Sequence, residues 1–156
     1  MTGGVIPRKP KPPRGVPLLL AVGMIAPEPA LAEWVQIAQS EQLEVFEIEP
    51  LRITLGQGKT AQAWMRSDAS KVTPPRRYAK TMQLFEFDCD SQPRMRTLQS
   101  VTYGFDGEVI AQHAPSAPPF LAPIPDSIGE AALKYVCNQA TLRRDFKAWL
   151  SRQPKK

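Results

Sequence analysis

The beginning of the chain constrains the fold most, because it sets the redox environment of everything that follows. Four basic residues lie within residues 8–14, and an apolar run from Val16 to Ala26 comes after them. Ala30-Leu31-Ala32 then has the small-x-small pattern that a signal peptidase cleaves. The apolar run falls well short of the roughly 20 residues that a membrane-spanning helix needs. Residues 1–32 are therefore predicted to be a cleaved signal peptide, and the mature protein is predicted to begin at Glu33.

Export predicts a disulfide bond. The chain contains two cysteines, Cys89 and Cys137, and in a periplasmic or secreted domain of this size two cysteines are usually bonded to each other. Their separation of 48 residues differs from the C-x-x-C spacing of a redox-active pair. The bond would stabilise the fold by about 4 kcal/mol in the chain-entropy model.

The charge is unevenly distributed along the mature chain. Residues 33–138 carry 10 basic and 13 acidic side chains, a net charge of −3, whereas residues 139–156 carry six basic and one acidic, a net charge of +5. Nucleic-acid-binding domains present a basic face. The composition therefore argues against nucleic acid as a partner of residues 33–138.

Period-two apolar patterns and turn residues predict an antiparallel sheet of about six strands. The expected strands cover residues 33–40, 43–55 with an interruption at Pro50, 59–65, 78–89, 94–105 and 108–111, and residues 66–77 are expected to form a loop. Asp106-Gly107 is a hairpin signal. The apolar pattern changes face between Leu84 and Phe85, which predicts either a β-bulge or a strand buried on both sides.

A helix is predicted after the proline-rich connector at residues 113–125. Ser127 and Glu130 have the spacing of a capping box, with Asp126 as an alternative cap. The apolar face of this helix holds Ile128, Ala132, Leu133, Val136 and Cys137. The expected fold class is thus α+β, with the disulfide fixing the helix to the strand that ends at Cys89.

The last 18 residues predict a basic amphipathic helix or tail, separate from the domain at 33–138. Leu142, Phe146, Trp149 and Leu150 recur at helical spacing among the cations Arg143, Arg144, Lys147 and Arg152. Three interpretations remain open: a second helix that docks its apolar stripe on the domain, a segment that binds an anionic membrane surface, a glycan or a protein partner, or a frayed or disordered end. In the second case the binding residues are Arg143, Arg144, Phe146, Lys147, Trp149, Leu150 and Arg152.

Other chemically suggestive residues have simpler explanations. His113 is the only histidine and is expected at the surface. Asp88 and Asp90 are expected at a solvated strand end opposite Arg94 and Arg96. Residues 56–60, GQGKT, lack the glycine spacing of a phosphate-binding loop. No catalytic group, metal site or cofactor is predicted.

Three segments together resemble the surface-adhesin protein E-like family of proteobacterial secreted proteins. They are YAKTMQLFEFDC, RMRTLQSVTYGFDGEV and PIPDSIGEAALKYVC, which run from Tyr78 to Cys137. The resemblance implies an antiparallel sheet of about six strands, one helix held by the cysteine pair, and an envelope or surface location. For the family's namesake it also implies adhesion to host matrix proteins. The tail from Leu142 onward lies outside the resemblance.

The sequence as a whole predicts an exported, non-enzymatic envelope or surface protein that acts as a binding or adhesion-type module. A periplasmic structural or assembly factor is the alternative, and a small secreted hydrolase is a weaker one, because the chain has no G-x-S-x-G nucleophile motif.

Overall fold

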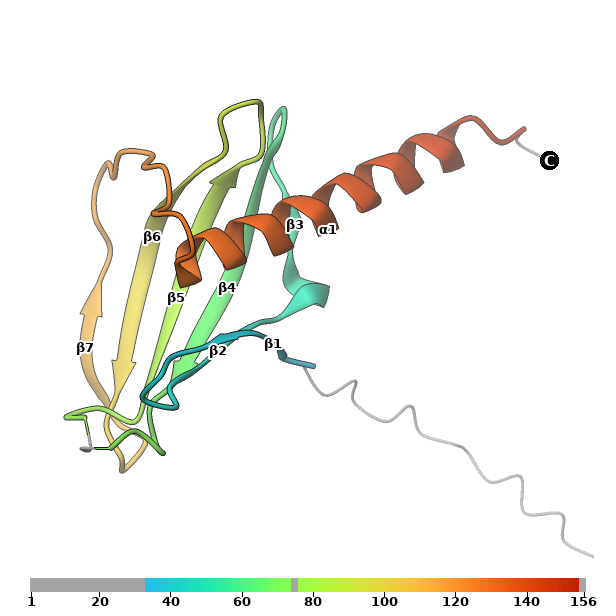
Figure 1. Cartoon of the computed structure of the whole chain (residues 1–156). Helices are drawn as coiled ribbons and strands as arrows, with labels where there is room; N and C mark the ends of the chain where they lie inside the picture. Colours follow the sequence, from blue (N-terminus) through green and yellow to red (C-terminus); the bar gives the residue numbers. More distant parts are fainter. Residues whose placement is uncertain (1–32, 74–75, 155–156) are drawn as a thin grey trace, which may run out of the picture.

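The computed structural model describes residues 33–73 and 76–154 as one antiparallel sheet and one long helix (Figure 1). The predicted signal peptide lies outside the described residues. The sheet has seven strands in the order β1-β2-β4-β5-β6-β7, and the short β3 pairs with β4. This confirms the α+β class, and β3 accounts for the strand beyond the six expected.

The elements follow the predicted order along the chain. Their bounds are β1 Val35–Gln39, β2 Val45–Ile48, the 3-10 turn η1 Pro50–Arg52, β3 Thr54–Leu55, β4 Thr60–Asp68, β5 Lys80–Asp88, β6 Arg94–Tyr103, β7 Val109–His113 and α1 Ile128–Ser151. Pro50 interrupts the second predicted strand as expected, because proline cannot donate to a ladder.

The core lies between α1 and one face of the sheet. Every second residue of β4 from Ala61 to Ser67 is buried, as are Phe85 and Phe87 on β5. Ala132, Leu133, Val136 and Ala140 form the buried face of α1. Small alanine side chains on both surfaces let the helix approach the strands closely. The helix therefore covers the large Phe87 ring completely.

The pairing of β5 with β6 shifts register at the predicted position, between Leu84 and Phe85, but the β-bulge lies in β6. Leu84 pairs with Gln99, but the next residue, Phe85, pairs with Thr97, so Leu98 of β6 is the extra residue. The period-two apolar pattern of β6 predicts that its apolar residues share one face. Because of the bulge, they lie on both faces of the sheet. Thr97 faces α1 beside Phe85. Val101 and Tyr103, at even spacing from Thr97 but beyond the bulge, face the opposite side of the sheet.

β4 is longer than predicted for the span 59–65. The sequence places Arg66 at the start of a loop, but β4 continues to Asp68. Residues 66–68 stay in the sheet because they pair with β5 on one side and with β2 on the other. Arg66 and Asp68 alternate with the buried Ser67 and lie on the face of the sheet that no helix covers, and the Ser67 hydroxyl is hydrogen-bonded to that of Thr81.

The helix begins as predicted and ends much later. The Ser127 hydroxyl accepts a hydrogen bond from the Glu130 N–H, and a Glu130 carboxylate oxygen accepts one from the Asp126 N–H. These bonds satisfy free N–H groups of the first turn. α1 then runs without a break from Ile128 to Ser151, so residues 139–151 continue this helix and do not form a second one.

Candidate binding surfaces

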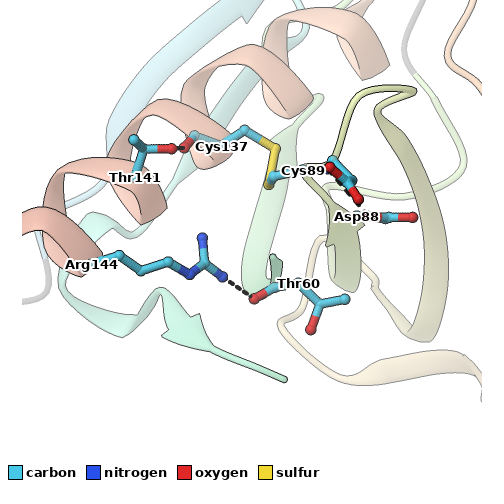
Figure 2. The surroundings of a disulfide bond; sticks show 7 residues. Thr60, Asp88, Cys89, Cys137, Thr141 and Arg144 are labelled. Atoms are coloured by element: carbon cyan, nitrogen blue, oxygen red, sulfur yellow. Dashed lines mark hydrogen bonds between the residues drawn. A yellow bond between two sulfur atoms is a disulfide. The ribbon is translucent and has the colours of Figure 1, made fainter. Parts of the chain in front are cut away.

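The disulfide fixes the middle of α1 to the end of β5. Cys89 follows β5 directly, and its sulfur is bonded to that of Cys137, with 5.4 Å between the two Cα atoms (Figure 2). The pairing predicted from the sequence is confirmed. Both cysteines are packed against the core, so the bond joins the helix to the sheet at the place where their apolar surfaces meet.

Two arginines extend this attachment along the helix. The Arg144 guanidinium donates to the Thr60 carbonyl oxygen at 2.6 Å (Figure 2). The Arg143 guanidinium donates to the carbonyl oxygens of Ile53 at 2.6 Å and Pro50 at 2.5 Å. These carbonyls lie at η1, just after it, and at the start of β4. Those of Pro50 and Thr60 also accept backbone hydrogen bonds, from the N–H groups of Ile53 and Gly56. Arg143 and Arg144, predicted as surface-binding residues, are thus engaged within the domain.

Beyond this attachment the helix projects past the strands (Figure 1). We call residues 128–140 the docked half of α1 and residues 141–151 the projecting half. The projecting half exposes four large apolar side chains, with exposed fractions of 63% for Leu142, 60% for Phe146, 52% for Trp149 and 50% for Leu150. The Phe146 and Trp149 rings stack with 5.9 Å between their centroids. We call these four residues the apolar stripe.

The apolar stripe does not dock on the domain, so that interpretation of the sequence is wrong. Helical geometry explains the result. At about 100° per residue, the stripe is centred roughly 110° from the buried face of the docked half. The side of the projecting half that continues the buried face carries Arg143, Arg144 and Lys147 instead. The stripe therefore lies on a flank of the helix and does not face the sheet.

The remaining predicted tail cations lie on either side of the stripe. Lys147 borders a hollow that it shares with Leu55 and Gly56, and the Arg152 side chain donates to the Ala148 carbonyl oxygen. Of the seven residues predicted for surface binding, the structure brings Phe146, Lys147, Trp149, Leu150 and Arg152 together on the projecting half. Their role in binding stays a prediction.

The other sequence candidates lie at the surface in ion pairs or turns. Asp88 pairs with Arg94 at 2.8 Å, and Asp90 pairs with Lys59 at 2.7 Å, which lowers the pKa of the Asp90 carboxyl. Arg96, expected opposite these aspartates, pairs instead with Glu86. His113 ends β7 and is exposed. Within residues 33–73 and 76–154, no three His, Cys, Asp or Glu side chains are grouped to hold a metal ion.

Sequence reasoning missed a groove on the sheet face opposite α1, which we call the open face. The groove has a volume of about 560 Å³ and is lined by aromatic rings, by Arg52, Arg66 and Lys80, and by a few aliphatic and polar side chains. Its aromatic residues are Trp34, Trp64 and Tyr103. Trp64 and Arg66, two residues apart on one strand, indicate that an aromatic ring and a cation share a face of the sheet. The other groove residues come from distant parts of the chain, and the sequence does not show that the strand register places them beside this pair.

The part of the chain that matches a known protein family contains the sheet and most of the core. A sequence model of the family described as Surface-adhesin protein E matches residues 34–138. The chain belongs to the Surface-adhesin protein E family. The match covers the sheet and the docked half of α1 up to residue 138, and it ends before the projecting half. None of the curated protein sequences matches the chain.

Two solved structures of Haemophilus influenzae protein E are similar to this Surface-adhesin protein E family member. Crystal form II aligns with a TM-score of 0.50 and 13% identity over 69% of this chain and 89% of that chain. A second structure of protein E aligns with a TM-score of 0.46, also at 13% identity, over 69% of this chain and 86% of that one. At this identity the first alignment shows a shared fold. No helix in the part of the chain that the structure describes is long and apolar enough to span a bilayer.

Proposed function

We propose that this chain is an exported, non-enzymatic binding module of adhesion type, located in the periplasm or at the cell surface. Membership of a surface-adhesin family supports this, as does the signal-peptide pattern of residues 1–32. Neither cysteine is a free thiol, because both form the disulfide, and the only histidine ends an exposed edge strand.

We further propose that the projecting half of α1 attaches the module to an anionic membrane surface. The observation that carries this proposal is the apolar stripe, which is at least half exposed on a helix segment that extends beyond the sheet. A helix that lies in a membrane interface buries such a stripe and directs its cations toward the lipid headgroups. Lys147 and Arg152 lie at the margins of the stripe, and residues 139–156 carry a net charge of +5.

Charge complementarity favours this occupant over a neutral apolar partner. The rest of the mature chain, residues 33–138, has a net charge of −3 and would be repelled by anionic lipids. Each Lys or Arg near an anionic surface contributes about 1 kcal/mol, and salt screens this attraction. Binding is therefore expected to be oriented, with the projecting half at the membrane and the sheet away from it.

The test is binding of the mature protein to vesicles of phosphatidylglycerol and phosphatidylcholine, measured by co-sedimentation. Phe146→Ser with Trp149→Ser should abolish binding at low salt. The matched control, Phe105→Ser with Ile110→Ser, removes two apolar side chains of similar exposure on the β6–β7 hairpin and should bind like wild type. Equal binding by the two double variants, or no binding by the wild type, would contradict the proposal.

A second pair of variants tests the electrostatic part. Lys147→Glu with Arg152→Glu should weaken binding by well over tenfold, because two favourable contributions of about 1 kcal/mol each are replaced by repulsion. Lys71→Glu with Arg77→Glu makes the same change in net charge on exposed loop positions. If both pairs weaken binding equally, overall charge and not the projecting half is responsible.

A further inference from the structure

The groove on the open face is a second potential binding site, separate from the projecting half of α1. Its residues come from β4, β5 and β6 and from the segments that precede β1 and follow β2. Its volume of about 560 Å³ lies within the usual range for small-ligand sites, about 300–1,000 Å³. The helix, the disulfide and the apolar stripe take no part in it.

Aromatic rings and cations alternate along this groove. The Arg66 guanidinium lies over the Trp34 ring, 4.5 Å from its centroid, and the Lys80 ammonium lies 4.9 Å from the centroid of the Tyr103 ring. Trp64 lies on the same strand as Arg66, two residues before it, and is half-buried. These contacts hold the rings and cations in place without a ligand, so binding would require little ordering.

The charge of the groove favours an anion. Three cations line it, Arg52, Arg66 and Lys80, against one carboxylate, Glu49. Glu49 pairs with Arg52 at 3.0 Å, and Glu47 pairs with Arg66 at 2.5 Å. Within the described residues Lys80 forms no ion pair, although Asp68 lies directly across from it on β4, and its ammonium group contacts the face of the Tyr103 ring.

The position of the groove disfavours an extended peptide as the ligand. β5 has a hydrogen-bonded neighbour on each side along its whole length. β4 pairs with β5 on one side and with β3 and β2 on the other, except at Ala63 and Trp64. A peptide that binds by strand addition needs the free N–H and C=O groups of a sheet edge, and a gap of two residues between two paired segments does not provide one. A ligand must therefore be recognised by the aromatic ring faces, the cations and the Gln99 amide. These groups suit a cyclic ligand that has one apolar face and carries an anionic group.

We propose that this groove binds an acidic saccharide. The apolar face of a sugar ring would lie on Trp64, the carboxylate would pair with Lys80, and the hydroxyls would meet the polar side chains at the margin. This inference is independent of membrane attachment, because the ligand is soluble and its site lies on the other face of the sheet from α1.

Tryptophan fluorescence can report on the groove alone. It contains three tryptophans, of which Trp34 and Trp64 line the groove and Trp149 lies on the apolar stripe. In a Trp149→Phe protein all tryptophan emission therefore reports on the groove. Hyaluronan hexasaccharide, which carries glucuronic acid, should change this emission saturably. Chitohexaose, a neutral saccharide of the same length, and hexaglutamate, an anion without sugar rings, should not.

Variants locate the site, with affinity measured by titration calorimetry. Lys80→Gln and Trp64→Leu should each weaken hyaluronan binding by about tenfold. Lys134→Gln removes the same charge from the exposed side of α1 and should leave the affinity unchanged. No change in emission with hyaluronan, an equal change with hexaglutamate or chitohexaose, or unaltered affinity in the Lys80→Gln protein would each overturn the proposal. Lys80 is near the surface, so this variant remains informative if Trp64→Leu does not fold.

Discussion

The docked and projecting halves of α1 belong to one helix yet interact with their surroundings in opposite ways. In the docked half the apolar side chains face the sheet, and Ala132, Val136 and Ala140 are completely buried. In the projecting half the apolar side chains lie on a flank of the helix, and the sheet-facing side carries Arg143 and Arg144. The difference shows that an apolar stripe predicts docking only when it continues the face that is already buried.

Attachment also differs in kind between the two halves. The docked half is held by apolar contact and by the Cys89–Cys137 bond. The projecting half is held at its base by guanidinium groups that donate to backbone carbonyls at η1, Ile53 and Thr60. Hydrogen bonds of this kind position a helix without covering its outer face, which leaves the stripe available for a partner.

Removing the disulfide is the largest expected perturbation of this arrangement. Cys89→Ser with Cys137→Ser should lower the free energy of unfolding by about 4 kcal/mol, the chain-entropy value for a loop of 48 residues. Urea denaturation of the oxidised wild type and the double variant measures the difference. A reduced wild type should match the variant. A loss below about 1 kcal/mol would mean that apolar packing alone holds the docked half.

The same substitution in the two halves gives the sharpest comparison. Leu133 is 6% exposed and Leu142 is 63% exposed. Leu133→Ala should cost about 2–5 kcal/mol of unfolding free energy, because it removes buried methyl groups and leaves a cavity. Leu142→Ala should cost less than about 0.5 kcal/mol. Similar losses for the two would show that the projecting half packs against something in solution.

Much of the fold could be predicted from local signals. Pro50, Asp106-Gly107 and the Ser127–Glu130 box mark the breaks and starts that the structure shows. The change of face at Leu84 marks the place where the β5–β6 register shifts, although the extra residue lies in β6. These signals need only neighbouring residues. The cysteine pair was predictable for a different reason: the chain has no other cysteine with which either could pair.

The surfaces could not be predicted to the same extent. Arg143 bonds to carbonyls about 90 positions earlier in the chain, and no local pattern encodes that distance. Trp34, Trp64 and Tyr103 meet only because antiparallel pairing brings three segments into register. The continuation of α1 beyond residue 138 is not predicted, because the net charge changes from −3 for residues 33–138 to +5 for residues 139–156 and the tail lies outside the family resemblance, which together favour a separate element.

Arginine anchoring can be tested by a smaller perturbation. Arg143→Gln with Arg144→Gln removes three charge-assisted hydrogen bonds and should lower the free energy of unfolding by about 1–3 kcal/mol. Hydrogen exchange should accelerate mainly in residues 141–151, while residues 128–138 stay protected. Arg152→Gln is the control, because Arg152 bonds only within the helix. Uniform acceleration along α1 would show that the arginines do not anchor one half selectively.

The smallest effect concerns the charged cap of the docked half. The hydrogen bond from Lys134, together with one from the Asp126 N–H, lowers the pKa of the Glu130 carboxyl below its ordinary value. A carboxyl with a lowered folded pKa stabilises the fold above its unfolded pKa and loses that contribution as the pH falls through the folded value. The stabilisation should therefore be complete at pH 7, decrease as the pH falls below the ordinary pKa of a glutamate, about 4.3, and be lost entirely only below the lowered folded pKa.

Glu130→Gln isolates this contribution, because glutamine can still accept the Asp126 hydrogen bond but carries no charge. Wild type should be slightly more stable than this variant at pH 7, and the two should converge in acid, as followed by thermal unfolding between pH 7 and 3. Lys134→Gln removes the main cause of the lowered pKa and should shrink the difference without altering the cap. If the difference between wild type and Glu130→Gln instead grows as the pH falls, the carboxylate does not stabilise the start of the helix, and the docked half depends on packing and the disulfide alone.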